Sequence, residues 1–102
     1  MEKNKFLKFL GLCKKSGKIL SGDYSVEKGI YHNKVLLMIL SEDCSKEKGK
    51  KFTKLGQEFG IDIIQTCTTD ELGSAIGKHL SSVIAITDIH QKNKIMTLYV
   101  EK

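Results

Sequence analysis

The 102-residue sequence contains no arginine, no proline and no closely spaced pair of cysteines. Because lysine is the only strongly basic residue, the chain cannot make the planar two-bond contact by which arginine reads guanine. Cys13, Cys44 and Cys67 are an odd number at wide spacings, which excludes a zinc knuckle and a disulfide framework. Free thiols suit a reducing compartment, so we expect a cytoplasmic protein. The lack of proline excludes no fold class.

Signatures of nucleotide binding and of hydrolysis are absent as well. The chain has no Gly-x-Gly-x-x-Gly loop, no Walker loop and no nucleophile elbow. Gly73 and Gly77 do not form a phosphate loop, because they belong to a predicted helix and such a loop precedes one. His32, His79 and His90 have no acidic or cysteine ligand at helical spacing, so we expect no metal. The sequence therefore predicts a non-catalytic protein without cofactor or small-molecule substrate.

One pair of carboxylates leaves an enzyme open as a weaker alternative. Glu42 and Asp43 follow the predicted central strand, at the edge where α/β sheets place ligands. They would suit a divalent metal. We instead expect the pair to cap the third predicted helix, which is a common role of aspartate.

The apolar N-terminus resembles a lipoprotein signal only faintly. Lys8 interrupts the short apolar run, and Leu12 stands where a small residue should precede the cysteine. No segment is long enough to span a bilayer. We therefore expect neither secretion nor a membrane partner.

The positive charge is unevenly distributed. The chain has 17 lysines against 12 acidic residues, a net charge of +5. Residues 1–51 hold 12 lysines and 6 acids, a net of +6, whereas residues 52–102 hold 5 lysines and 6 acids, a net of −1. A basic half of this kind points to a polyanionic partner, with ordinary solvated lysines as the alternative.

Apolar spacing and turn signals predict alternating helices and strands. Helices are predicted over about residues 4–15, 23–32, 46–59, 68–77 and 88–102. Strands are predicted over about residues 18–20, 35–40, 61–64 and 83–86. This order is typical of a single α/β domain, here over residues 1–102, folded as a three-layer α/β/α sandwich with four strands.

Several residues mark where these elements begin and end. Asp23 is a plausible N-cap of the second helix, and Gly60 is suited to end the third. The spacing Thr68-x-x-Glu71 predicts a capping box at the start of the fourth. The continuous apolar run 35–40 predicts a strand covered by helices on both faces.

The second predicted helix has an unusual outer face. Val26 and Ile30 lie on its buried side. The opposite stripe carries Tyr24, Lys28, Tyr31 and His32, with Ser25 at its edge. Aromatic rings can stack on unpaired bases, a lysine can hold a phosphate, and a helix N-terminus attracts anions. RNA binding is one interpretation, and an ordinary exposed helix with scattered aromatics is the other.

Landmarks along the chain resemble those of a known family. They are Gly17-Lys18-Ile19, Gly22 and Lys28, the apolar strand running into Ser41-Glu42-Asp43, the strand after Gly60, Leu72-Gly73-Ser74-Ala75-Ile76-Gly77, and Val83–Ile86. Over about residues 4–90 the chain resembles the kink-turn-binding ribosomal proteins of the L-seven-Ae and L-thirty-e group, particularly short bacterial members of the YlxQ type. The resemblance implies a mixed four-stranded sheet and a ribosomal or ribosome-associated protein that binds RNA kink-turns.

The RNA-contact motif of that family, Gly-x-Asn-Glu-x-x-Lys, is only half kept. Gly22 and Lys28 match it, whereas Tyr24 replaces the asparagine and Ser25 replaces the glutamate. In the family, these two polar side chains meet the sheared G·A pairs of the kink. Tyrosine and serine cannot repeat that donor and acceptor pattern, although Tyr24 can stack and Ser25 can form one hydrogen bond.

A second family contact is the loop after the glycine-rich helix, here residues 78–82, which packs on a flipped-out nucleotide. The predicted RNA-binding residues are therefore Lys18, Gly22, Asp23, Tyr24, Ser25, Lys28, His32, Lys78, His79 and Leu80. We expect a monomer bound to structured RNA, either a kink-turn or ribosomal RNA. The alternative is a protein-interaction module that keeps the fold but has lost the motif, with Tyr24 and Tyr31 as its anchor.

Overall fold

The computed structural model describes residues 1–101, so Lys102, the last residue of the predicted domain, lies outside the described part. Within residues 1–101 the helices are α1 (Lys3–Lys15), α2 (Asp23–Tyr31), α3 (Lys46–Phe59), α4 (Thr69–Ala75) and α5 (Ile89–Val100). The strands are β1 (Ile19–Ser21), β2 (Leu37–Leu40), β3 (Asp62–Gln65) and β4 (Val83–Ile86). The predicted order of helices and strands is confirmed.

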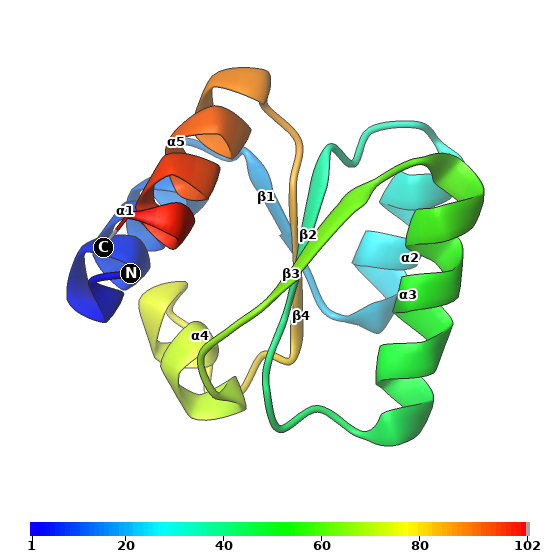
Figure 1. Cartoon of the computed structure of the whole chain (residues 1–102), viewed down its shortest axis with the longest axis horizontal. Coiled ribbons are helices and arrows are strands. Elements are labelled where there is room, and N and C mark those ends of the chain that lie inside the picture. The colour runs from blue at the N-terminus through cyan, green and yellow to red at the C-terminus, as the bar shows by residue number, and fades with distance from the viewer. Residues whose placement is uncertain (102) are drawn as a thin grey trace.

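The four strands form one mixed sheet in the order β1-β4-β2-β3. Strands β2 and β3 are parallel, whereas β4 is antiparallel to both of its neighbours. Figure 1 shows α1, α4 and α5 on one face of the sheet and α2 and α3 on the other. The predicted three-layer α/β/α sandwich with a mixed four-stranded sheet is therefore confirmed.

The two central strands separate two apolar cores. All four residues of β2 and all four of β4 are buried. Leu37 and Ile39 belong to the core under α1, α4 and α5, whereas Met38 and Leu40 belong to the core under α2 and α3. Successive side chains of a strand point to opposite faces, which is why an uninterrupted apolar run was required here.

Strand β2 begins at Leu37 and not at Val35. Leu37 pairs with Ile86, the last residue of β4, so the ladder has no partner residue for Val35. No helix within residues 1–101 combines the length and the apolar character needed to cross a membrane.

Two predicted helix boundaries are confirmed by their hydrogen bonds. The Thr68 hydroxyl accepts from the Glu71 N–H at 3.1 Å, and the Glu71 carboxylate accepts from the Thr68 N–H at 2.9 Å, which completes the capping box. Gly60 ends α3 in the left-handed conformation, with φ 66°. Both arrangements satisfy backbone hydrogen-bonding groups that the end of a helix would otherwise leave without a partner.

Two predicted caps are wrong. Gly22, not Asp23, is the N-cap of α2, and Asp23 is the first helical residue. Its carboxylate lies 2.9 Å from the Lys48 ammonium, so it is engaged with α3 instead of with its own helix. The N-cap of α3 is Ser45, whose hydroxyl accepts from the Lys48 N–H at 3.1 Å, in place of the expected Glu42 and Asp43.

The loop after α4 lies directly on that helix. Gly77 has φ 74°, and the Lys78 N–H returns to the Gly73 carbonyl at 2.8 Å, which closes the helix in the manner of a Schellman motif. A Cβ added at Gly73 would lie 2.8 Å from the His79 oxygen and 2.8 Å from the Leu80 Cα. Gly73 is therefore required for the close packing of residues 78–82.

Gly73→Ala should destabilise the fold, because backbone atoms would have to move to admit the methyl group. We expect a loss of about 1–3 kcal/mol in the free energy of unfolding, although alanine alone favours a helix over glycine. Denaturant unfolding measures this loss, with Ser74→Ala on the exposed side of α4 as control. Equal stability of the two variants would contradict the packing argument.

Candidate nucleic-acid interface

The start of α2 and residues 78–82 lie side by side, although they are far apart in the sequence. The Gly22 N–H donates to the Val83 carbonyl at 3.2 Å, which fixes the start of α2 beside the end of the loop. The two segments border a cavity of about 470 Å³. It is lined by Ser21, Gly22, Asp23, Lys48, Thr69, Lys78, Leu80, Ser81 and Ser82. The fold thus brings four predicted residues together, namely Gly22, Asp23, Lys78 and Leu80.

Gly22 sets the direction in which α2 leaves the sheet. Its φ of 88° and ψ of 153° lie in a region that is open essentially only to glycine. A Cβ there would meet no atom within 4 Å, so the backbone conformation, not space, requires glycine. Because glycine offers no side-chain acceptor, the N-cap leaves first-turn N–H groups of α2 free to face an anion.

Lys48 also lines the cavity, and it is not among the residues predicted from the sequence. Its ammonium lies 2.9 Å from the Asp23 carboxylate and donates to the Ser82 hydroxyl at 2.6 Å. The side chain is only 26% exposed. Lys48 therefore links α3 to both walls of the cavity. A signal was present, since Lys48, Phe52 and Leu55 share the i, i+4, i+7 spacing of the buried face of α3.

The carboxylates after β2 hold the beginning of α4 in place. Asp43 accepts from the Thr69 N–H at 2.8 Å and from the Thr69 hydroxyl at 2.7 Å. These bonds lower the pKa of Asp43. Glu42 accepts from the Cys67 N–H at 2.9 Å. Both side chains thus serve the structure of the chain, and in residues 1–101 no three His, Cys, Asp or Glu side chains gather as a metal site.

A second hollow, of about 220 Å³, follows the outer face of α2. It is lined by Leu20, Tyr24, Ser25, Lys28, Gly29, His32 and Lys34. Tyr24 is 76% exposed, and the Lys28 ammonium lies 6.0 Å from the centre of its ring. This hollow therefore brings together four predicted residues, namely Tyr24, Ser25, Lys28 and His32. It adjoins the first cavity, because Tyr24 directly follows Asp23 in the chain.

Tyr31 faces α3 instead of this hollow. Its ring meets the Phe59 ring edge-on, with centroids 5.3 Å apart and an interplanar angle of 89°. The Lys51 ammonium lies 2.7 Å from the Glu27 carboxylate, and this hydrogen bond raises the pKa of Lys51. Both contacts join α2 to α3. Phe59 is 37% exposed because it packs against Tyr31 at the contact between α2 and α3 and not in the core.

Two predicted residues lie outside both hollows. Lys18 is at the opposite end of β1 from Gly22, where its carbonyl accepts from the N–H and the hydroxyl of Thr87, each at 3.2 Å. His79 is exposed, and it contributes its backbone to the packing on α4.

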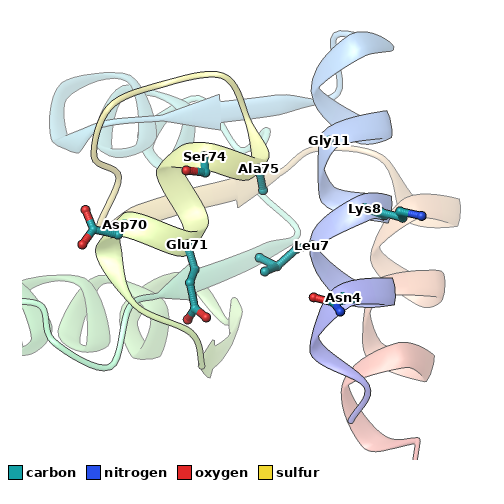
Figure 2. Close-up of a pocket in the computed structure, with 8 residues that line it drawn as sticks. All are labelled: Asn4, Leu7, Lys8, Gly11, Asp70, Glu71, Ser74 and Ala75. Atoms are coloured by element: carbon teal, nitrogen blue, oxygen red, sulfur yellow. The ribbon is translucent and has the colours of Figure 1, made fainter.

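The larger hollow between α1 and α4, about 620 Å³, contains none of the predicted residues. Figure 2 shows Leu7 on α1 pointing toward α4, from which Glu71 extends, whereas the Lys8 side chain points away from α4. The backbone N–H of Thr68 and the ammonium of Lys3 lower the pKa of Glu71. Asp70 adds a second carboxylate to this hollow, and none of the ion pairs in residues 1–101 engages it, whereas Asp23 in the smaller cavity is paired with Lys48. The smaller cavity beside Gly22 is therefore the better candidate for phosphate.

Comparison with known proteins identifies relatives of the whole fold. The model of the ribosomal protein L7Ae/L30e/S12e/Gadd45 family matches residues 4–96. RNA-binding protein YlxQ of Bacillus subtilis (strain 168) is 33% identical over 89 residues, which cover 87% of this chain and 89% of the relative.

Two solved structures share the arrangement of helices and strands. A protein of unknown function from Bacillus halodurans C superposes with a TM-score of 0.91 at 32% identity, covering 95% of this chain and 98% of its own. The 15.5kD RNA binding protein of Giardia lamblia superposes with a TM-score of 0.80 at 17% identity, covering 96% of this chain and 85% of its own. Since the family model spans most of the sequence, this chain belongs to the ribosomal protein L7Ae/L30e/S12e/Gadd45 family.

Proposed function

We propose that this chain is a non-catalytic RNA-binding protein whose RNA lies over the start of α2 and the loop 78–82. The observation that carries the proposal is the cavity in which Gly22 meets Lys78 and Leu80, next to the hollow of Tyr24 and Lys28. The names of the relatives from Bacillus subtilis and Giardia lamblia, both called RNA-binding, support it.

Each wall of the site suits a different part of a nucleotide. The free N–H groups at the start of α2 and the ammonium groups of Lys28 and Lys78 suit phosphate. Leu80, which is 53% exposed, offers an apolar surface to a base that has left its stack. Tyr24 offers a ring on which a second base can stack. This combination favours folded RNA with unpaired bases over a plain duplex, whose bases are covered.

The preferred RNA in this proposal is a kink-turn or a similarly structured element, in a cytoplasmic ribosomal or ribosome-associated particle. Tyr24 and Ser25 stand where the family motif has asparagine and glutamate. Recognition here therefore relies on stacking and phosphate contacts more than on hydrogen bonds to G·A pairs. The Lys48–Asp23 ion pair also leaves the Asp23 carboxylate neutralised, which lowers its repulsion of phosphate.

Lys28→Ala should weaken binding of a kink-turn RNA and reduce the slope of log K against log salt by about one. The reason is the loss of one lysine–phosphate contact and its released counterion. Fluorescence titration at several salt concentrations measures both quantities. Lys8→Ala, on the opposite layer, is the matched control, and an equal effect of the two variants would place RNA elsewhere.

Tyr24→Ala should reduce affinity by about 1–3 kcal/mol if one base stacks on the ring, whereas Tyr24→Phe should retain most of the affinity. The same titration measures both variants. If Tyr24→Phe binds as weakly as Tyr24→Ala, the hydroxyl group and not the ring is the contact.

The kink-turn component is tested with a second RNA that lacks the G·A pairs. We expect it to bind more weakly than the kink-turn at moderate salt, because it does not hold the bent shape that reaches both walls of the site. If the two RNAs bind alike, kink-turn specificity is lost and general RNA affinity remains.

The exposed aromatic side chains of α2 and α3 favour a second candidate function. Tyr24 and the Tyr31–Phe59 pair form a surface of the kind that anchors a protein partner. A pulldown from lysate with and without ribonuclease separates the two functions. Recovery of the same proteins after ribonuclease would favour the protein-interaction module.

A further inference from the structure

Three lysines form a row along the side of α3 that borders strand β3. Lys46, Lys50 and Lys54 recur at i, i+4 and i+8, so their side chains leave the helix about 6 Å apart. All three are exposed. They line a shallow groove of about 400 Å³, to which Thr53, Gln57 and Gln65 add hydroxyl and amide groups. We call these three residues the lysine row.

The charges of the lysine row are not neutralised by the protein. On the other sides of the same helix, Lys48 pairs with Asp23 and Lys51 pairs with Glu27. Across residues 1–101, no ion pair involves the lysine row. Like charges one helical turn apart repel each other, so an external polyanion would relieve a repulsion that no ion pair within residues 1–101 offsets.

The lysine row begins at the start of α3, on the side of that helix opposite to the proposed RNA site, since two helical positions lie about 200° apart. Lys46 is the first residue of α3, and two positions later Lys48 reaches into the cavity beside Gly22. Figure 1 shows α3 starting after the loop that follows β2 and then running along the sheet. A strand of RNA that leaves the cavity therefore has to pass around the start of α3 before it meets these lysines in succession.

The groove has the chemistry of a phosphate-binding surface. None of the residues that line it is a large exposed hydrophobic side chain. A protein partner is commonly anchored by aromatic or apolar contacts, and the groove offers none. Single-point ammonium groups with neighbouring amides and hydroxyls instead suit a phosphodiester backbone, whose recognition is independent of base sequence.

We propose that the lysine row is a second RNA-contact surface, which holds the phosphate backbone beyond the segment bound at α2 and the loop 78–82. This inference rests on the proposed function for the position of the first segment. It assigns to α3 a contribution to affinity and to salt dependence, not to sequence or kink-turn recognition.

The test compares two triple variants with the same change in net charge. The test variant carries Lys46→Gln, Lys50→Gln and Lys54→Gln. The control variant carries Lys5→Gln, Lys8→Gln and Lys94→Gln, all exposed positions in the layer on the opposite side of the sheet. Circular dichroism and thermal unfolding confirm that both variants fold. The probes are a short kink-turn RNA and the same RNA with each stem lengthened by one helical turn.

With the wild-type protein, we expect a steeper salt slope for the lengthened RNA than for the short one. The test variant should lose this increment, about two to three units of slope for three phosphates, whereas the control variant should keep most of it. Both variants should bind the short RNA with nearly unchanged slope. If the two variants affect the lengthened RNA equally, only net charge matters and the inference is overturned.

The failure of the kink-turn component of the proposed function has a different signature. In that case the wild-type protein would bind both kink-turn RNAs no better than scrambled duplexes of the same lengths. The two triple variants are then compared on the longer scrambled duplex. A selective loss in the test variant still supports the lysine row as a backbone-binding surface, whereas an equal loss in both overturns it.

Discussion

The candidate site depends on the close packing of residues 78–82 against α4. Gly73 has no side chain, which lets the backbone of His79 and Leu80 lie on the helix, and Gly77 turns the chain back at its end. The loop then enters β4, whose first residue, Val83, accepts a hydrogen bond from Gly22. The cavity therefore exists because one helix allows a backbone approach that a methyl group would prevent.

Lys48 adds an electrostatic link across the same place. Its ammonium bonds to Asp23 at the start of α2 and to Ser82 at the end of the loop. An ion pair that is partly shielded from water holds its geometry better than a fully exposed one. The cation thus positions both walls of the cavity and at the same time makes the cavity less negative, which is what an RNA site beside an aspartate requires.

The fold was largely predictable, because the spacing of apolar residues along a strand or a helix depends directly on which of its faces are buried. The apolar runs of β2 and β4 predicted a sheet covered on both faces, and Thr68 with Glu71 predicted the start of α4. The wrong caps have a common cause. Asp23 and the carboxylates after β2 find partners in other elements, and such long-range contacts leave no local spacing in the sequence.

Most of the candidate residues that the resemblance to the family supplied line the two hollows. Gly22, Lys28 and Leu80 lie at the two hollows, whereas Lys18 lies at the far end of β1. Lys48 was not predicted, because among the many lysines of the chain it differs only in lying on the buried face of α3.

The most direct test of the account is a map of backbone amide chemical shifts of the isotope-labelled protein during titration with a kink-turn RNA. The account predicts that the largest changes fall in residues 22–28 and 78–82. It would be contradicted if those residues were unaffected and the changes lay in the hollow between α1 and α4.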